Sequence, residues 1–481
     1  MKDLKTYVNG RSVGILGLGV SNLPLAEKLI NMGVPLTVRD KKTPEELGEG
    51  ALALKARGVR FVSGAGCFDD IEEDLIFRSP GLRPDLPAIK AVQSRGGELT
   101  SEIELLLEFC PCDTFAITGS DGKTTSTTLT GKFFDLEGKK CNKTTYVGGN
   151  IGTPLLTRCE EMTSSDNVVL ELSSFQLMTV KRSPMYVAIT NVTPNHLDWH
   201  GKMEEYIEAK KNIIGSFTRR VVVNANNEIT RCIGISAAKD GKEVIFFSST
   251  AKSFDEAVPS SCQGALAVIL CDGAITITDG RKVEKLLDVK DIKVPGMHNV
   301  ENFMTAIALT YGKVSADVYY AVAESFFGVE HRLEFVRRLD GVDYYNSSID
   351  SSPTRTAAAL SALGERDIII ICGGYDKKIP YAPLAEHLFA HAKAVVLTGA
   401  TAPKIDLAMT EYAESHRSIP APRKEFAEDF GTAVSKARLL AEELGKNAPC
   451  VLLSPASASF DCFKNFAERG NVFKDIVNRL K

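Results

Sequence analysis

The sequence of 481 residues lacks the features of a membrane protein, a nucleic-acid-binding protein or a disulfide-rich secreted domain. No apolar run approaches the roughly 20 residues that a membrane-spanning helix needs, and the N-terminal stretch MKDLKTYVNG is too polar for a signal peptide. The 57 Lys and Arg nearly balance the 61 Asp and Glu, which predicts no basic surface for nucleic acid. The eleven cysteines follow no regular spacing, so we expect reduced thiols in a cytoplasmic protein.

The sequence also contains no internal repeat and no low-complexity segment. At roughly 100–200 residues per domain, its length indicates about three domains. Short apolar runs typical of strands alternate with stretches of helical periodicity, which favours parallel sheets. We therefore predict an α/β protein of three consecutive domains over residues 1–111, 112–327 and 328–481, the second with a β-rich extension at about 225–292.

The second domain opens on a phosphate-loop-like sequence that lacks one standard glycine. In FAITGSDGKTTSTTL (115–129), Ile117 stands where the pattern G-x-x-x-x-G-K-[ST] requires glycine. Gly119 and Gly122 still allow backbone N–H groups to face an anion at the start of a helix. Lys123 can neutralise phosphate, and a following threonine hydroxyl can reach Mg²⁺. An ordinary strand–helix turn without a ligand is the alternative for this loop alone.

A second glycine turn, GILGLGVSN (14–22), carries an incomplete dinucleotide fingerprint. Gly17 and Gly19 fit the pattern, but Asn22 occupies the position of the third glycine. Asp40 follows about 20 residues later at a strand end and could meet a ribose hydroxyl. A tight turn without a ligand explains the motif about as well, and a nucleotide diphosphate fits it as well as NAD does.

Candidate metal and phosphate ligands follow further strands. Glu171 comes directly after an apolar strand and could hold Mg²⁺ opposite the phosphate loop. His196 and Asp198 form a His-x-Asp pair that could bind metal or orient phosphate. His200 is expected to be a surface loop residue. The residue pattern alone predicts that Lys210 is a solvated lysine on an amphipathic helix.

Later candidates are two asparagines and one arginine. Asn299 and Asn302 lie three residues apart, so on a helix they share a face that could bind an adenine edge or ribose; helix capping by Asn299 is the alternative. Arg332 lies at the junction of the second and third domains, where it could reach phosphates when a cleft closes.

These motifs stand in an order that resembles the ATP-dependent Mur ligase superfamily, which includes the folylpolyglutamate synthases. The motifs are TGSDGKTT, GGNIGTP, LELSSFQL, NVTPNHLD, GMHN-x-x-N and EHRLE. The phosphate loop of that family, TG-x-[NK]-GKTT, also lacks the early glycine. The stretches GLGVSN, Ser79-Pro80-Gly81 and LSPASASFDCFKNFAERG resemble the branch that adds D-glutamate, and the resemblance covers nearly the whole chain.

The resemblance implies a Rossmann-like N-terminal domain, a P-loop-type central ATPase domain and a Rossmann-like C-terminal domain. These domains would bind UDP-N-acetylmuramoyl-L-alanine, ATP and D-glutamate, respectively. The implied reaction transfers the γ-phosphate to the L-alanine carboxylate, and the D-glutamate amine then attacks the acyl phosphate through a tetrahedral intermediate. Two Mg²⁺ ions would offset the charge of the reacting groups. A cytoplasmic monomer without nucleic-acid or membrane partners is expected.

The resemblance also implies roles for individual residues. The implied catalytic residues are Lys123, His196 and Lys210. The implied ATP-binding residues are Gly119, Ser120, Asp121, Gly122, Lys123, Thr124, Thr125, Asn299, Asn302 and Arg332. The implied Mg²⁺ ligands are Thr124, Glu171, His196 and a carbamylated Lys210, which stands four residues after Tyr206. The implied substrate-binding residues are Gly17, Val20, Ser21, Asp40, Lys41, Ser79, Pro80, Gly81, Asn150, Ser173, Gln176, Lys377, Ser459 and Phe466.

One segment departs from the pattern of the family. Many relatives have NDSKATN where this sequence has NSSIDSS (346–352), so Ser347 replaces Asp and Ile349 replaces Lys. Arg355 nearby could supply the missing charge. Three alternatives stay open: a Mur-type or folylpolyglutamate-type ligase with another amino acid or acceptor, an inactive nucleotide-binding module, and a nicotinamide oxidoreductase.

Overall fold

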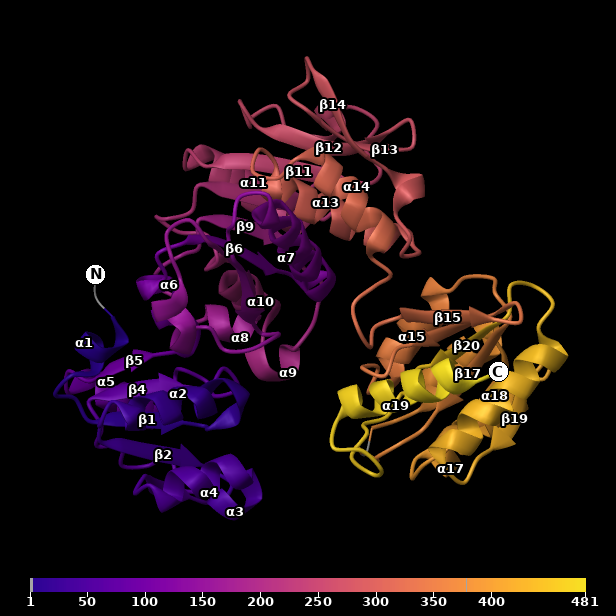
Figure 1. Ribbon diagram of the computed structural model, residues 1–481, viewed down its shortest axis with the longest axis horizontal. Helices are drawn as coiled ribbons and strands as arrows, with labels where there is room; N and C mark the ends of the chain where they lie inside the picture. The colour runs from indigo at the N-terminus through magenta and orange to yellow at the C-terminus, as the bar shows by residue number, and fades with distance from the viewer. Residues whose placement is uncertain (1–2, 378) are drawn as a thin grey trace. The chain divides into compact units, whose positions relative to one another are not determined.

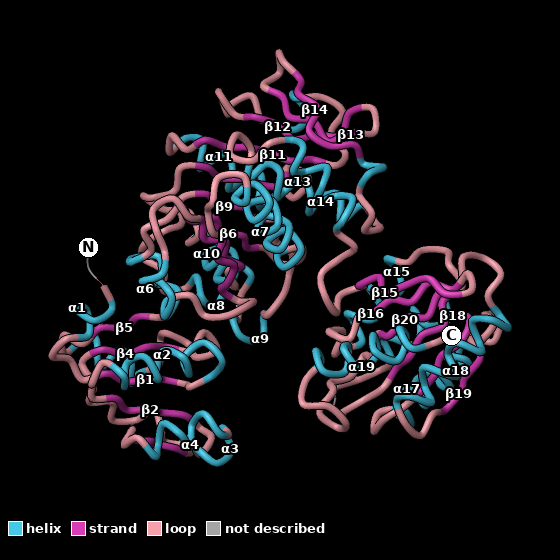
Figure 2. The backbone as a smooth tube through the Cα atoms, in the orientation of Figure 1, coloured by secondary structure: helices cyan, strands magenta, loops and turns pink. Residues whose placement is uncertain are grey.

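The structure is a computed structural model that describes residues 3–377 and 379–481 (Figure 1). The chain forms two compact units, one of residues 1–292 with 297–324 and the other of residues 293–296 with 325–481. In the described residues, the first unit holds two sheets and the second unit holds one. Strands and helices alternate along most of the chain (Figure 2), which confirms the predicted α/β class. The domain boundaries after residues 111 and 327 stay predictions.

The N-terminal sheet has the strand order β3-β2-β1-β4-β5, and all its neighbouring strands are parallel. Its strands are β1 (Val13–Leu16), β2 (Leu36–Asp40), β3 (Arg60–Ser63), β4 (Leu75–Arg78) and β5 (Glu98–Thr100). Its helices are α1 (Leu4–Val8), α2 (Gly19–Asn31), α3 (Pro44–Leu47), α4 (Glu49–Ala56), α5 (Pro87–Ser94) and α6 (Glu102–Phe109). Strands β1 and β4 are buried throughout, as expected for the centre of a parallel sheet covered on both faces.

The central sheet has the order β14-β13-β12-β11-β10-β9-β6-β8-β7. Its strands are β6 (Asp113–Thr118), β7 (Thr145–Gly149), β8 (Asn167–Glu171), β9 (Tyr186–Ile189), β10 (Arg220–Asn224), β11 (Glu243–Ser248), β12 (Leu266–Cys271), β13 (Ala274–Thr278) and β14 (Val283–Asp288). The helices of this region are α7 (Lys123–Lys139), η1 (Leu156–Glu161), α8 (Ser174–Leu177), α9 (Leu197–His200), α10 (Met203–Lys211), α11 (Glu228–Lys239), α12 (Phe254–Ala257), η2 (Val289–Asp291), α13 (Met297–Thr310) and α14 (Ala316–Ser325). Strands β6 to β12 pair in parallel, so their carboxyl ends, which carry the candidate site, share one edge.

The predicted β-rich extension continues this central sheet. Strands β13 and β14 add to its edge as antiparallel neighbours. The interpretation of residues 225–292 as short strands missed helix α11. Asn227 caps this helix by accepting a hydrogen bond from the Thr230 amide, and Ile233 and Ala237 are buried on one face. The stretch RCIGISAAK mixes helix formers with a glycine and two β-branched isoleucines, so its local propensity is weak and packing on the sheet decides.

The sheet of the second unit has the order β15-β16-β20-β17-β18-β19, with β15 antiparallel to β16 and the other pairs parallel. Its strands are β15 (Glu334–Leu339), β16 (Val342–Asn346), β17 (Ile368–Cys372), β18 (Ala392–Leu397), β19 (Arg423–Phe426) and β20 (Cys450–Leu453). Its helices are α15 (Pro353–Ala362), α16 (Ala382–His391), α17 (Ala402–Ser415), α18 (Phe430–Leu444) and α19 (Phe466–Arg479). Separate buried clusters of apolar side chains lie on the two faces of this sheet.

All eleven cysteines lie in the described ranges, and each is a free thiol. In those same ranges, no helix is both long and apolar enough to span a membrane.

Candidate active site

The phosphate loop joins β6 to α7 through two glycines with positive φ. Gly119 and Gly122 have φ values of 150° and 79°, which L side chains rarely adopt. A Cβ at Gly122 would lie 2.5 Å from Asn302 Oδ1, and one at Gly119 would collide with the Thr190 hydroxyl. Glycine is therefore required at both positions of TGSDGKTT for steric reasons.

Hydrogen bonds from the neighbouring strand end hold this loop in place. Asn191 Oδ1 accepts from the amides of Ser120 and Asp121 at 3.1 and 2.9 Å. The Ser120 hydroxyl lies 3.0 Å from the hydroxyl of Tyr206 on α10. The first N–H groups of an α-helix have no partner within the helix. The start of α7, which carries Lys123, Thr124 and Thr125, thus offers N–H groups and a positive helix end to an anion.

Two lysines converge on one carbonyl of the loop. Lys123 Nζ donates to the oxygens of Gly119 at 2.9 Å and Ser120 at 2.8 Å. Lys210 Nζ, on α10, donates to the same Gly119 oxygen at 2.7 Å and lies 3.5 Å from Thr118 Oγ1. Lys211 instead pairs with Glu208 at 2.7 Å on the helix surface. The tertiary fold therefore distinguishes two neighbouring lysines that have the same chemistry.

The residue pattern had predicted a solvated Lys210, and this prediction is wrong. The side chain is only 1% exposed, and its ammonium lies over the Tyr206 ring at 4.5 Å from the centroid. Burial, reinforced by the nearby positive charge of Lys123, lowers the pKa of Lys210 to about 6. A large part of the Lys210 population is therefore a neutral amine at neutral pH. The helix pattern could not reveal this, because the residues that bury Lys210 come from β6 and the phosphate loop.

Glu171, the last residue of β8, is buried and only one of its two carboxylate oxygens accepts a hydrogen bond from the described residues. It is 2% exposed, and its Oε1 accepts from Asn150 Nδ2 at 2.7 Å. Its Oε2 is buried without a hydrogen-bond partner in residues 3–377 and 379–481. A buried carboxylate oxygen left in this state is costly unless a cation or donor binds it. Carboxylate oxygens are preferred Mg²⁺ ligands, so this side chain fits the predicted metal role.

The structure places His196 and His200 in different environments. His196 precedes α9, has a φ of 55° and an exposed side chain, and its ring contacts Phe175 edge-on at 5.0 Å. The expectation of a surface His200 is wrong, because this ring is buried, stacks on Phe175 and lies 2.9 Å from the Ser174 hydroxyl. Burial also lowers the pKa of His200. Asp198 belongs to α9, but its side chain lies outside the described atoms.

Two predicted substrate ligands are also structural caps. Ser173 and Gln176 form a capping box at α8: the Ser173 amide donates to Gln176 Oε1 at 2.9 Å, and the Gln176 amide donates to Ser173 Oγ at 3.3 Å. Both side chains are buried. Their contact with substrate stays a prediction, and the capping role was missed although S-x-x-Q is a capping signature.

The N-terminal turn is closed by its own polar side chains. Asn22 Nδ2 donates to the Gly17 oxygen at 2.8 Å, so the residue in the third-glycine position fastens the turn. Asp40 accepts from the amides of Leu18 at 2.9 Å and Lys42 at 3.0 Å. A Cβ at Gly17 would lie 2.9 Å from Ser79 Cβ. The backbone of the glycine turn and the Ser79–Gly81 loop are therefore close neighbours.

The other candidates of this region lie on the same edge of the N-terminal sheet. They are Ser21 at the start of α2, Lys41 after β2, and Pro80 and Gly81 after β4. The backbone of Val20 belongs to α2, and its side chain is outside the described atoms.

Asn299 and Asn302 face the start of α7. Asn302 Nδ2 donates to Asn299 Oδ1 at 3.2 Å, and Ser126 Oγ donates to Asn302 Oδ1 at 3.2 Å. Helix α13 begins at Met297, so Asn299 lies inside the helix, which does not fit the capping alternative. Both amides are buried beside the phosphate loop, where an adenosine contact stays a prediction.

The candidates of the second unit gather around its strand-end loops. Lys377 Nζ donates to Ser351 Oγ at 3.3 Å, and Ser348 Oγ donates to the Phe466 oxygen at 2.8 Å. Ser459 is buried, whereas the Phe466 side chain is 39% exposed. Arg332 is half-buried and forms an isolated antiparallel bridge with Val329 near the start of the unit.

The segment that departs from the family pattern carries its own charges. Arg355 is exposed on α15, and its Nη1 donates to the Ile349 oxygen at 3.3 Å, so a cation does stand next to the position of the missing lysine. Asp350, which had no assigned role, is buried and accepts from Ser454 Oγ at 2.8 Å. Burial raises the pKa of Asp350 to about 6.

Arg469 is a further residue that the sequence interpretation missed, although it lies within the quoted motif NFAERG. It is 2% exposed and donates to the oxygens of Ser348, Ser457 and Ala458 at 2.9–3.1 Å. It therefore joins the segment at 346–352 to the loop that carries Ser459.

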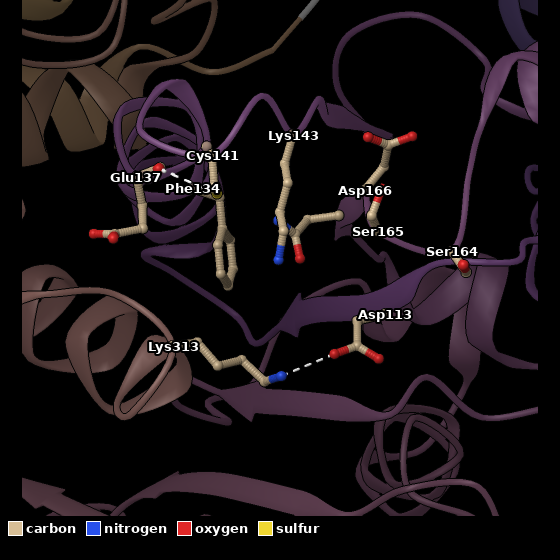
Figure 3. A pocket seen from close by; sticks show the side chains of 11 residues that line it. Asp113, Phe134, Glu137, Cys141, Lys143, Ser164, Ser165, Asp166 and Lys313 are labelled. Carbon is tan, nitrogen blue, oxygen red and sulfur yellow. Dashed lines mark hydrogen bonds and ion pairs between the residues drawn. The ribbon is translucent and has the colours of Figure 1, made fainter.

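A pocket of about 400 Å³ lies at the opposite edge of the central sheet, where the strands begin (Figure 3). Lys313 Nζ donates to Asp113 Oδ2 across it at 2.8 Å. Its lining residues are Asp113, Phe134, Glu137, Gly138, Cys141, Lys143, Ser164, Ser165, Asp166, Asn167 and Lys313. None of the predicted site residues belongs to this set, so the pocket is separate from the candidate site.

Comparison with known proteins agrees with this arrangement. Residues 117–310 match the Mur ligase middle domain, and residues 331–456 match the Mur ligase glutamate ligase domain. The chain is 42% identical to the UDP-N-acetylmuramoylalanine–D-glutamate ligase of Ruminiclostridium cellulolyticum and 43% identical to that of Acetivibrio thermocellus, in each case over 100% of this chain and 99% of the relative.

Solved structures support the same fold. The UDP-N-acetylmuramate–alanine ligase of Thermotoga maritima aligns with a TM-score of 0.56 at 18% identity, covering 98% of this chain and 100% of that one. A UDP-N-acetylmuramoyl-L-alanyl-D-glutamate–2,6-diaminopimelate ligase aligns with a TM-score of 0.53 at 16% identity, covering 92% and 93% of the two chains. Together with the full-length relatives, these matches show that the chain belongs to the Mur ligase family, within the group of UDP-N-acetylmuramoylalanine–D-glutamate ligases.

Proposed function

We propose that the protein is an ATP-dependent ligase that joins D-glutamate to UDP-N-acetylmuramoyl-L-alanine and releases ADP and phosphate, a step of peptidoglycan precursor synthesis. The observation that carries the proposal is the convergence of Lys123 and Lys210 on the Gly119 carbonyl of the TGSDGKTT loop. Relatives that are 41–43% identical over their full length and carry this activity in their names support it. The protein acts as a monomer in the cytoplasm.

The residues of the first unit fit a magnesium site. Glu171 brings a buried carboxylate oxygen without a protein partner among the described residues, and the hydroxyl of Thr124 follows the loop lysine. His196 and a carbamylated Lys210 complete the set of residues that would hold two ions. When bound, Mg²⁺ supplies positive charge that offsets the triphosphate and the acceptor carboxylate.

Lys210 is suited to carbamylation because its amine is largely neutral. A neutral amine attacks the carbon of CO₂, an N–C bond forms while one C–O π bond breaks and its electrons move to oxygen, and one amine proton leaves to solvent. The product carries a negative charge, so a buried cation becomes a buried acid. Lys123, whose ammonium donates to the same Gly119 oxygen, offsets that new charge.

The phosphate loop performs the transfer by electrostatics and positioning. Lys123 and the N-terminal end of α7 neutralise the γ-phosphate while the acceptor carboxylate oxygen bonds to its phosphorus and the bond from that phosphorus to ADP breaks. The D-glutamate nitrogen then bonds to the acyl carbon, the carbon–oxygen bond to phosphate breaks, and the amine loses a proton. Asn299 and Asn302 bind adenosine, and Arg332 binds the phosphates of ATP.

Along the chain, the domain that binds the UDP-sugar precedes the ATP-binding domain, and the domain that binds D-glutamate follows it. The N-terminal domain holds the UDP-sugar with Gly17, Ser21, Asp40, Lys41 and the Ser79–Gly81 loop, assisted by Asn150, Ser173 and Gln176 of the central domain. The C-terminal domain holds D-glutamate with Lys377, Ser459 and Phe466. Arg355 supplies the cation that Ile349 lacks.

The deciding experiment is phosphate release from ATP and UDP-N-acetylmuramoyl-L-alanine in the presence of D-glutamate, L-glutamate or L-lysine. We expect release to depend on D-glutamate. Equal release with all three amino acids, or with L-lysine above D-glutamate, would contradict the proposal and favour another Mur-type ligase. Release without any amino acid would indicate a nucleotide-hydrolysing module instead.

A further inference from the structure

Arg78, the last residue of β4, makes hydrogen bonds in two domains. Its Nη1 donates to the oxygen of Pro80 at 3.1 Å, in the Ser79–Gly81 loop of the N-terminal domain, and to that of Leu82 at 2.5 Å, directly after this loop. Its Nη2 donates to the oxygen of Phe175, in α8 of the central domain, at 2.9 Å and lies 3.3 Å from Oγ1 of Thr179, which follows that helix. One guanidinium therefore fastens the predicted substrate loop to the segment that begins with Ser173.

The side chain of Arg78 cannot contact a substrate. It is 1% exposed, and both of its terminal nitrogens already donate to protein acceptors. Burial lowers the pKa of Arg78 only to about 10, so the guanidinium stays charged at neutral pH. A charged group with this arrangement of donors fixes the geometry of the carbonyl groups around it. Its role must therefore act through the loop that it holds.

A second contact fixes the same loop to the central domain. Trp199 Nε1 donates to the Gly81 oxygen at 3.1 Å, and Arg83 Nη1 donates to the Trp199 oxygen at 2.7 Å. Arg83 also pairs with Glu205 on α10 at 3.0 Å. The loop thus contacts α9 through Gly81, and Arg83, two residues after the loop, contacts both α9 and α10.

The surface that receives the loop carries the predicted metal and phosphate residues. Trp199 and His196 both contact the Phe175 ring edge-on, at 4.7 and 5.0 Å between centroids. Beyond Phe175, His200 stacks on that ring and contacts Tyr206, whose hydroxyl reaches the phosphate-loop residue Ser120. A continuous set of packed side chains therefore lies between the substrate loop and the phosphate loop.

We propose that Arg78 is a positioning residue that locks the Ser79–Gly81 loop onto α8 and α9, so that the acceptor carboxylate meets the phosphate loop in register. The inference rests on the proposed function, since it takes this loop to hold the UDP-linked acceptor. A misplacement of about 1 Å between reacting groups can cost on the order of 100-fold in rate. Loss of the lock should therefore reduce turnover more than it reduces acceptor binding.

The test compares Arg78→Met with Lys28→Met in the full-length protein. Lys28 is the matched control because it also joins the two domains, donating to the Thr157 oxygen at 2.8 Å, but lies on α2 away from the loop. For Arg78→Met we expect kcat to fall at least about 10-fold while the Kd for UDP-N-acetylmuramoyl-L-alanine and the KM for ATP stay within about threefold, because only transition-state geometry is lost. Lys28→Met should stay within about twofold of the unaltered protein in all three quantities.

Two results would overturn the positioning role: a kcat of Arg78→Met within twofold of the unaltered protein, or a loss of acceptor affinity as large as the loss of kcat. The second result would make Arg78 a support of the binding pocket alone. Failure of the unaltered protein to release phosphate with D-glutamate would instead refute the proposed function, so the two failures are distinguishable.

Milder variants keep the test valid if Arg78→Met does not fold. Thr179→Val removes one acceptor of Arg78, and Trp199→Phe removes the hydrogen bond to Gly81 while keeping an aromatic ring. Each should lower kcat about threefold with an unchanged Kd for the acceptor, and Arg78→Lys should retain more activity than Arg78→Met. Unchanged kcat in both Thr179→Val and Trp199→Phe would contradict the proposal.

Discussion

Lys210 beside the phosphate loop and Arg469 beside the amino-acid loops are both buried cations, but their surroundings differ. Lys210 has one short hydrogen bond, to the Gly119 oxygen, and a like charge nearby on Lys123. Arg469 donates to backbone oxygens of three residues and to the Ser348 hydroxyl. Burial lowers the pKa of Lys210 to about 6 but that of Arg469 only to about 10.

This difference in surroundings makes Lys210 reactive and makes Arg469 a structural support. A buried amine with few acceptors gives up its proton and becomes a nucleophile, whereas a guanidinium that donates to several acceptors keeps its charge and holds loops together. The first arrangement is unfavourable for the folded protein until a modification or ligand relieves it. The second stabilises the second unit without any ligand. Substitutions should therefore affect catalysis in one region and folding in the other.

The largest expected effect is that of Lys123→Ala. This change removes the cation that neutralises phosphate, and we expect phosphate release to fall by roughly 10²–10³-fold or more. It also removes the like charge near Lys210, so the pKa of Lys210 should rise. Steady-state phosphate release measures the first effect, with Lys132→Ala, further along α7, as the control. Retention of more than a tenth of the activity would contradict the phosphate-loop assignment.

Lys210→Met should lower activity by about 100-fold, because it removes the amine that is proposed to be carbamylated. Lys210→Arg should be equally inactive although it keeps a positive charge. This variant therefore tests whether the amine itself, and not only its charge, is required. In the unaltered protein, removal of bicarbonate and CO₂ should lower activity, and their return should restore it. Full activity of Lys210→Met, or no response to bicarbonate, would refute the carbamate.

The same lysine should make stability depend on pH. Because the folded-state pKa of about 6 lies below the ordinary value of 10.5, the unfolded chain binds more protons between these values. The stability of the unaltered protein should rise over this range relative to Lys210→Met. The variant should therefore have the higher melting temperature at pH 6, and the gap should close toward pH 10 in buffer free of CO₂. A gap that does not change with pH would contradict the buried neutral amine.

Arg469→Met should mainly affect folding. It leaves several buried carbonyl groups of the amino-acid loops without a donor, and we expect the second unit to lose about 3 kcal/mol of unfolding free energy. Denaturant unfolding measures the loss. Arg438→Met is the control, because Arg438 pairs with Glu442 at a partly exposed position and should cost less than about 1 kcal/mol. Equal unfolding free energies of the two variants would contradict a stabilising role of Arg469.

The smallest expected effect is that of the exposed cation Arg355. If it replaces the missing lysine, Arg355→Ala should raise the KM for D-glutamate about 10-fold and leave the KM for ATP nearly unchanged, as expected for loss of one charged hydrogen bond. Arg423→Ala, which removes a surface pair with Glu443, should change neither value. An unchanged KM for D-glutamate would show that Arg355 does not replace the lysine that relatives have at position 349.

The order of the motifs along the chain was enough to predict the α/β class and the phosphate loop, because both depend on local patterns. A strand followed by TGSDGKTT and a helix brings backbone N–H groups and a lysine together locally, whatever the rest of the fold is. Helix α11 could not be predicted in the same way, because its residues favour no structure strongly and packing on the central sheet decides.

The sequence by itself thus determined where anions would bind and which residues would follow the strands. The tertiary structure alone decided that Lys210 is buried while Lys211 is partly exposed, that His200 packs against α8, and that Arg78 and Arg469 hold loops. In each case the deciding contacts come from residues that are distant in the chain. Burial and hydrogen-bond partners set the protonation and the role of an ionisable side chain, and a local pattern contains neither.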